Sequence, residues 1–168
     1  MILNTHHTGF VVEDLENAID FYCKGLGFEI SARYERTGLP IQQVVGYESA
    51  HLNLALLSLG KEHLVELIQY ISPKPIPRPT NERSAIGSTH LAFLVDDIWG
   101  TFEHLKKCGA KVMNSPAAVS EGRVACYLQD PDGNWFEIVQ DDLHNREPFV
   151  VRQNRTIPTH LPSTGLIK

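Results

Sequence analysis

The sequence lacks the features that mark several large protein classes. No stretch approaches the roughly 20 apolar residues that a membrane-spanning helix needs, so we expect no membrane partner. The formal net charge is −5 and the basic residues form no stripe, which argues against nucleic acid as a partner. The first residues lack a basic region followed by an apolar run, so we expect no signal peptide.

Cysteine is scarce as well. The 168 residues include three Cys, which are widely spaced and form no CxxC motif: Cys23, Cys108 and Cys126. This pattern indicates reduced thiols in a cytoplasmic protein. Hydrophobic residues make up 42% of the chain and charged residues 21%, as in an ordinary soluble globular protein.

A short pattern occurs twice in the chain. Residues 7–15 and residues 90–98 both read His, any residue, a small residue, Phe, any residue, Val, an acid, Asp and an aliphatic residue. Each copy is followed downstream by a second repeated segment, residues 65–69 and 136–140, in which Glu66 and Glu137 occupy matching positions. We therefore expect two small modules that share one core, since each alone would bury little apolar surface. The repeat aligns His7, rather than His6, with His90.

The first module, residues 4–71, is expected to contain four strands and one helix. Asp14 is a candidate N-cap of a helix that begins at Leu15, and the third and fourth strands are expected at 51–59 and 63–71. Residues 35–50 are expected to be irregular, because Gly and Pro interrupt them. On the third strand we expect Leu52, Leu54 and Leu56 to face one way, toward a core.

The second module, residues 88–141, repeats this order after a proline-rich linker at 72–87. His7 and Glu66 are 59 positions apart, whereas His90 and Glu137 are 47 apart. We assign the 12-residue excess to 35–50, where either a lid or substrate-contacting loop or a plain surface loop would fit. Residues 142–168 have no counterpart in the first module and form a C-terminal extension.

The duplicated βαβββ pattern resembles the vicinal oxygen chelate superfamily, which includes glyoxalase I, methylmalonyl-CoA epimerase, extradiol dioxygenases, and bleomycin- and fosfomycin-resistance proteins. The resemblance covers about residues 4–141. It implies an α+β fold in which two tandem βαβββ modules form a curved, partly closed mixed sheet with helices outside, in a single domain at 1–141. The motifs that carry it are His7-Thr8-Gly9-Phe10, Asp20-Phe21-Tyr22 before Leu26-Gly27-Phe28, Val65-Glu66-Leu67, residues 90–97, and Asp130-Pro131-Asp132-Gly133 followed by Phe136-Glu137-Ile138.

The resemblance implies a metal site with one ligand pair from each module. The implied ligands are His7, Glu66, His90 and Glu137. Two imidazoles and two carboxylates suit one divalent ion of Ni, Co, Mn, Zn or Fe. Residues of these types also occur as core His satisfied by the backbone and as edge-strand Glu in water, and these structural roles stay open.

The implied function is that of a metal-dependent isomerase, epimerase or lyase of the glyoxalase I type. Glu66 and Glu137 are candidate catalytic bases, which would abstract a proton next to the carbonyl of a small molecule. We expect a homodimer, and the site can belong to one chain or be shared between two. The glyoxalase residues that hold glutathione would fall near Val11 and Tyr70 and are missing, which argues against glutathione as cosubstrate.

Four further residues fall on strand positions that are expected to face the cavity. They are candidates for substrate contacts, or for purely structural roles: His51, Asn53, Arg123 and Tyr127. Two other functions stay open. An Fe(II)-dependent extradiol-type dioxygenase is favoured by Tyr127 and opposed by Glu66, and a metal-free small-molecule (antibiotic) binding protein is opposed by the intact ligand set.

Overall fold

The structure, a computed structural model, describes residues 1–60 and 63–142. These residues form nine strands and three helices. In chain order they are β1 (Thr8–Val12), α1 (Leu15–Leu26), β2 (Glu29–Thr37), α2 (Leu39–Val45), β3 (His51–Leu59), β4 (His63–Ser72), β5 (Leu91–Leu94), α3 (Ile98–Lys107), β6 (Lys111–Val112), β7 (Ala117–Ser120), β8 (Arg123–Gln129) and β9 (Trp135–Asp141).

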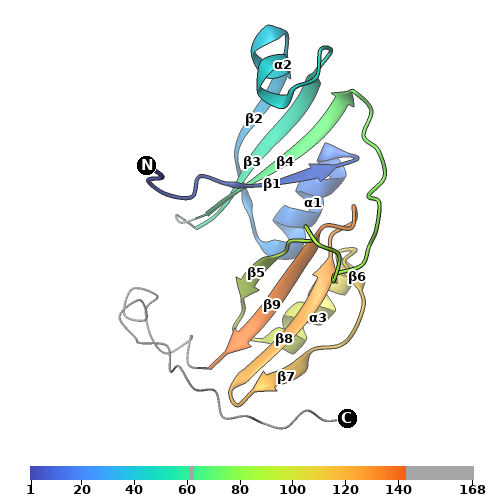
Figure 1. Ribbon diagram of the computed structural model, residues 1–168. Helices are drawn as coiled ribbons and strands as arrows, with labels where there is room; N and C mark the ends of the chain where they lie inside the picture. The colour runs from blue at the N-terminus through green and yellow to red at the C-terminus, as the bar shows by residue number, and fades with distance from the viewer. Residues whose placement is uncertain (61–62, 143–168) are drawn as a thin grey trace.

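Each module builds its own mixed sheet (Figure 1). The first sheet has the strand order β1-β4-β3-β2, and the second has β5-β9-β8-β6 with β7 beside β8. In each sheet the first strand of the module runs parallel to the last, and the other pairs are antiparallel. The α+β class is thus confirmed, and within one chain the two modules form separate sheets that do not close into a barrel.

The helix that follows the first strand of each module begins after an Asp cap, as predicted at Asp14. The Asp14 carboxylate accepts a hydrogen bond from the backbone N–H of Asn17, and Asp97 accepts one from Gly100, both at 3.0 Å. Helix α1 ends where Gly27 adopts a φ of 75°, a left-handed conformation that glycine reaches without strain.

The expectation that residues 35–50 are irregular is wrong in its details. Strand β2 continues to Thr37, and helix α2 occupies most of the remainder. Gly38 and Gly46 bracket this helix as its caps, and Pro40 lies in its first turn, where its missing N–H costs nothing. The residues that suggested an interruption are therefore the boundary residues of a short helix.

The predicted orientation of β3 is wrong with respect to the main core, although Leu52 and Leu54 are buried in a smaller core cluster. Ala55 and Leu57 lie in the main core, and both are 0% exposed. Leu54 and Leu56 pair with Ile68 and Glu66 of β4, which places them on the opposite face of the sheet. Leu54 instead joins a smaller cluster, in which Ile41 and Val45 of α2 pack over that face of the first sheet.

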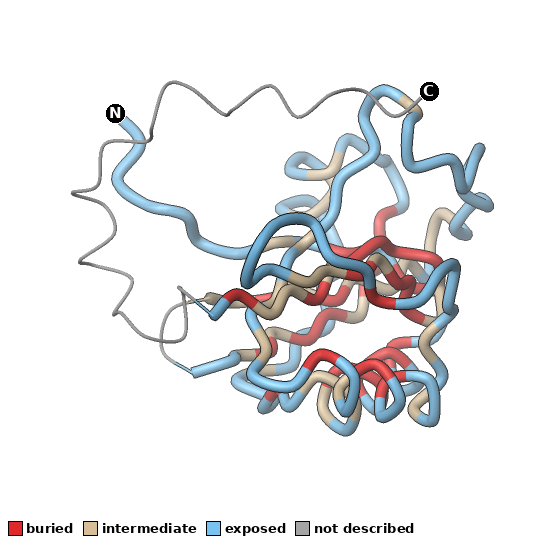
Figure 2. The backbone as a smooth tube through the Cα atoms, turned by 90° about the horizontal axis from the view of Figure 1, so that it is seen from below, coloured by how far each residue is buried: buried red, intermediate tan, exposed pale blue. Residues whose placement is uncertain are grey.

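The main core is shared by both modules. Side chains of α1 and α3 meet the inner faces of the two sheets in one continuous cluster (Figure 2 shows the buried segments gathered in the interior). Across this core the Tyr22 hydroxyl donates to the buried Asp130 carboxylate at 3.2 Å. Burial raises the pKa of Asp130, while hydrogen bonds from Asn134 oppose the shift.

The linker between the modules forms no helix or strand, as its prolines predict, from Pro73 to His90. Arg78 fastens it to the second module by donating to the Gly133 carbonyl at 3.1 Å. The three Cys are free thiols. Among the described helices none is long and apolar enough to cross a membrane. The predicted C-terminal extension lies outside the described residues beyond Asp142.

The Tyr22–Asp130 contact makes a prediction about stability. Asp130→Ala leaves the backbone N–H groups of Asp132 and Asn134 without their acceptor, so it should lower the free energy of unfolding by about 3 kcal/mol. Tyr22→Phe removes only one donor and should cost about 1 kcal/mol. Urea denaturation measures both values. Equal losses for the two variants would contradict this role of Asp130.

Candidate metal centre

The first candidate pair joins His7, which directly precedes β1, to Glu66 on β4. The parallel register of these strands places Gly9 beside Glu66, and His7 precedes Gly9 by two residues. The His7 Nε2 atom lies 3.3 Å from Glu66 Oε2, and the two side chains are 34% and 20% exposed. We call His7 and Glu66 the first half-site.

The second candidate pair has the same construction on β5 and β9. Here Ala92 lies beside Glu137, and His90 precedes Ala92 by two residues. The His90 Nε2 atom lies 3.4 Å from Glu137 Oε2, with side-chain exposures of 41% and 18%. We call His90 and Glu137 the second half-site. The matching registers give a physical basis to the alignment of the two sequence repeats.

The registers also explain the small residue in the repeated pattern. Gly9 and Ala92 are the direct neighbours of the two Glu residues on the adjacent strand. Side chains two residues apart on a strand share a face, so His7 and Glu66 point to the same side of the first sheet. A Cβ added at Gly9 would lie 3.3 Å from Ile68 Cδ1, so this face of the sheet leaves little room for a side chain there.

The two N–O distances fit a shared ion better than a direct contact. A charge-assisted hydrogen bond between imidazole and carboxylate measures about 2.7–2.9 Å. Two ligands on one ion, with bonds of about 2.1 Å at octahedral or tetrahedral angles, lie about 3.0–3.4 Å apart. The observed 3.3 and 3.4 Å therefore match neighbouring ligand atoms, and the donor types suit a divalent transition metal.

One chain does not bring the two half-sites together. Residues 1–60 and 63–142 contain no group of three or more His, Cys, Asp and Glu residues placed to hold one metal ion. Each half-site lies on its own sheet, on the face that points away from the shared core. On the first sheet, for instance, Val11 is 49% exposed on the Glu66 side while Val12 is 1% exposed on the core side.

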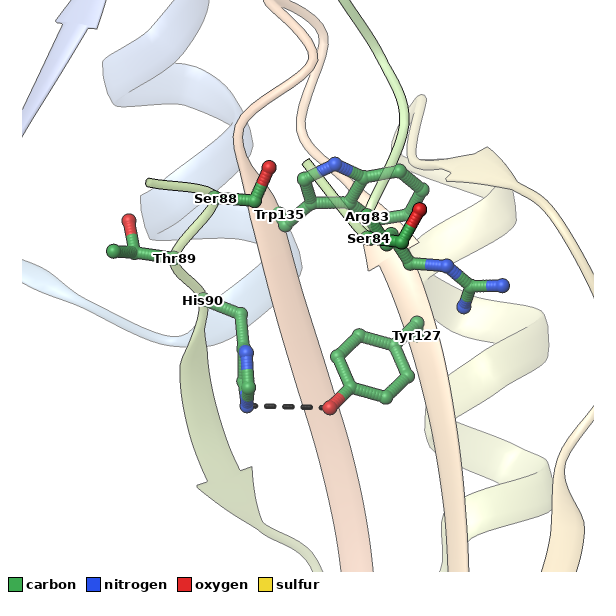
Figure 3. A pocket seen from close by; sticks show the side chains of 7 residues that line it. All are labelled: Arg83, Ser84, Ser88, Thr89, His90, Tyr127 and Trp135. Atoms are coloured by element: carbon green, nitrogen blue, oxygen red, sulfur yellow. Dashed lines mark hydrogen bonds between the residues drawn. The ribbon is translucent and has the colours of Figure 1, made fainter. Parts of the chain in front are cut away.

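A cavity of about 410 Å³ adjoins the second half-site (Figure 3). Its walls include Tyr127 and Trp135 from the sheet, His90 just before β5, and Arg83 from the linker. The Tyr127 hydroxyl lies 3.3 Å from His90 Nε2. Burial raises the pKa of Tyr127, the Glu137 carboxylate adds to the rise and the Arg83 guanidinium opposes it.

Two of the four predicted substrate contacts share a face with a half-site. Tyr127 pairs with Glu137 across β8 and β9, and Arg123 lies on the same face. The Arg123 guanidinium already donates two hydrogen bonds to Asp141, at 2.7 and 3.0 Å. Its charge is therefore engaged within the protein.

The other two predicted contacts lie on the core side of the first sheet. Asn53 pairs with Gln69, so its side chain points to the face opposite Glu66. His51 Nε2 lies 2.8 Å from the Glu35 carboxylate, and Glu35 pairs with Asn53. The structure therefore brings neither residue to a half-site. The expectation failed because the orientation of β3 had been reversed.

Sequence reasoning missed two residues of the cavity. Trp135 lies in the cavity wall, and its buried Nε1 has no hydrogen-bond partner among the described residues. Arg83 lies in a linker whose sequence carries no periodicity. Its approach to Tyr127 and Trp135 arises only in the folded structure.

The comparisons place the chain in a family. Residues 4–138 match the Glyoxalase/Bleomycin resistance protein/Dioxygenase superfamily, and the chain belongs to it. A probable lactoylglutathione lyase of Synechocystis is 27% identical over 137 residues, which are 80% of this chain and 92% of that one. A 2-epi-5-epi-valiolone epimerase of Actinomyces is 27% identical over 145 residues, 80% of this chain and 77% of that one.

Solved structures agree with this assignment. A glyoxalase family protein from Bacillus cereus superposes with a TM-score of 0.77 at 24% identity, over 83% of this chain and 95% of that one. Glyoxalase I from Zea mays gives 0.61 at 26% identity, over 82% of this chain but 44% of the maize chain. The maize chain is thus long enough to hold two units of the matched size.

The half-sites make a prediction about metal binding. Ni²⁺ or Co²⁺ at about 100 times its dissociation constant should raise the melting temperature by about 5–10 °C. Alanine at His7, Glu66, His90 or Glu137 should each remove most of this shift, as measured by differential scanning fluorimetry.

His51→Ala and Asn53→Ala serve as matched controls, since both residues lie on the core side of the first sheet. Both should keep the metal-induced shift. A shift that survives in Glu66→Ala, or disappears in His51→Ala, would contradict the assignment of the half-sites.

Proposed function

We propose that the protein is a metal-dependent lyase or isomerase that moves a proton next to the carbonyl of a small molecule. The observation that carries the proposal is the pair of equivalent His–Glu half-sites, each with the N–O separation of neighbouring metal ligands. His7, Glu66, His90 and Glu137 would hold one divalent ion. When bound, such an ion supplies polarisation of the substrate carbonyl and stabilisation of the resulting enediolate or enolate.

Glu66 and Glu137 are the proposed bases. Both carboxylates are mostly buried, at 20% and 18% exposed, and both project from strands toward the face that would receive the substrate. One carboxylate takes the proton beside the carbonyl and returns it to the same or the neighbouring carbon. The Tyr127 hydroxyl lies 3.3 Å from His90 Nε2 and can donate a hydrogen bond at the second half-site.

We further propose that two copies of the chain complete one centre. Strands β1 and β5 lie at the edges of their sheets, and the half-site faces beside them expose Val11 and Leu94, at 49% and 52%. Apolar side chains at open sheet edges favour association. A homodimer would set the first half-site of one copy against the second half-site of the other, and the length of the maize chain supports this arrangement.

One observation favours an Fe(II)-dependent dioxygenase as a second candidate. The contact between Tyr127 and His90 places a hydroxyl beside a proposed ligand, and the resemblance to extradiol enzymes implies a Tyr on this strand. Glu66 weighs against it. The His7–Glu66 distance is close to that of the pair in the second module, so Glu66 would be a fourth protein ligand. Aerobic oxygen uptake with catechol by the iron-loaded protein would favour this second candidate over the first.

Solvent deuterium exchange tests the proposed function. The metal-loaded protein should incorporate deuterium from D₂O into the carbon next to the carbonyl of at least one member of a panel of small aldehydes, ketones and 2-oxo acids, as followed by NMR. Glu66→Gln or Glu137→Gln should slow this exchange about 10²–10⁴-fold.

His51→Ala should exchange at the wild-type rate, because His51 pairs with Glu35 on the core side. Metal content is measured in every variant, which separates loss of the base from loss of the ion. Exchange that persists at the wild-type rate in both Gln variants would contradict the proposed bases.

A further inference from the structure

Arg83 occupies a distinctive position beside the second half-site. Its guanidinium carbon lies 5.2 Å from the ring centroids of both Tyr127 and Trp135. Figure 3 shows His90 at the hydroxyl end of Tyr127 and Arg83 toward the other end of the ring, with Ser84 next to it. A group bound to Arg83 would therefore lie in the same cavity as a group bound beside His90.

The donors of Arg83 are free, unlike those of Arg78 in the same linker. Arg78 donates to the Gly133 carbonyl at 3.1 Å and approaches the Asn134 side chain at 3.5 Å. Arg83 makes no hydrogen bond or ion pair with any part of the chain that the structure describes, only the two ring contacts. Arg78 thus has a structural role, while Arg83 presents an unpaired positive charge to the cavity.

The surroundings of Arg83 favour an anionic oxygen ligand. A guanidinium held over aromatic rings keeps its N–H groups in a fixed fork, and this fork matches a carboxylate in bidentate fashion. Ser84 lines the same cavity next to Arg83 and adds a hydroxyl that can donate a hydrogen bond to a bound anion (Figure 3).

We propose that Arg83 binds a carboxylate of the substrate, separate from the oxygens that bind beside His90 and Glu137. The substrate is then a small carbonyl acid rather than a neutral aldehyde or ketone, and Arg83 is a specificity-determining residue. This inference rests on the proposed function, since it takes the second half-site as the place of the reacting carbonyl. A purely structural Arg83 would fasten the linker to the sheet, and its loss would change stability but not selectivity.

Two 2-oxo acids of equal shape separate these roles. 2-Oxoglutarate carries a distal carboxylate, and 5-methyl-2-oxohexanoate carries an isopropyl group in its place. Binding is followed by the fluorescence of Trp135 in a Trp99→Phe background, in which Trp135 is the single remaining tryptophan of the two. The wild-type cavity should prefer 2-oxoglutarate by about tenfold or more, the usual value of a charge-assisted hydrogen bond.

Arg83→Gln should reduce this preference to about one, and Arg83→Lys, which keeps the charge without the fork, should retain part of it. Arg78→Gln is the matched control: it should lower stability and leave the preference unchanged. An unchanged preference in Arg83→Gln, or equal or absent binding of the two acids to the wild type, would overturn the inference. The titrations are done with and without Mn²⁺. Because the preference for 2-oxoglutarate is measured in both states, loss of the Arg83 contact can be told apart from failure of the metal centre.

Discussion

The hydrophobic core that α1 and α3 share with both sheets is the constraint on which the rest of the structure depends. It fixes one face of each sheet inward, and the hydrogen bond from Tyr22 to the buried Asp130 joins the modules within it. Since side chains alternate along a strand, Phe10 and Val12 point into the core while Gly9 and Val11 point away. The half-sites must therefore lie on outward faces of separate sheets.

This constraint leaves Glu66 and Glu137 mostly buried on the outward faces of their sheets. A carboxylate that is mostly buried on an apolar strand is costly unless a cation or a donor faces it. Glu66 and Glu137 each face one imidazole, at a distance suited to a common ion, and each stands beside a small residue on the neighbouring strand. Two half-sites of identical register, which one chain does not bring together, motivate the proposal that a second copy completes one centre.

The sequence predicted much of this arrangement because the repeat carries positional information. Aligning residues 7–15 with 90–98 selected His7 and matched Glu66 to Glu137, and the structure gives these pairs equal registers. The orientation of β3 could not be predicted, because residues 54–57 are all apolar. The hydrophobic pattern therefore does not show which of these side chains face the main core. Helix α2 was missed because helix caps and loop breakers use the same residue types, and Arg83 was missed because its contacts join a linker to a distant strand.

Complementation between two inactive chains tests the shared centre most directly. One chain carries His7→Ala with Glu66→Ala, the other carries His90→Ala with Glu137→Ala, and distinct tags allow purification of the mixed dimer after coexpression. A shared centre predicts no bound metal in either variant alone and about one ion per mixed dimer, because one of its two centres then receives both intact half-sites. A mixed dimer that binds no metal, although the wild type does, would contradict the account.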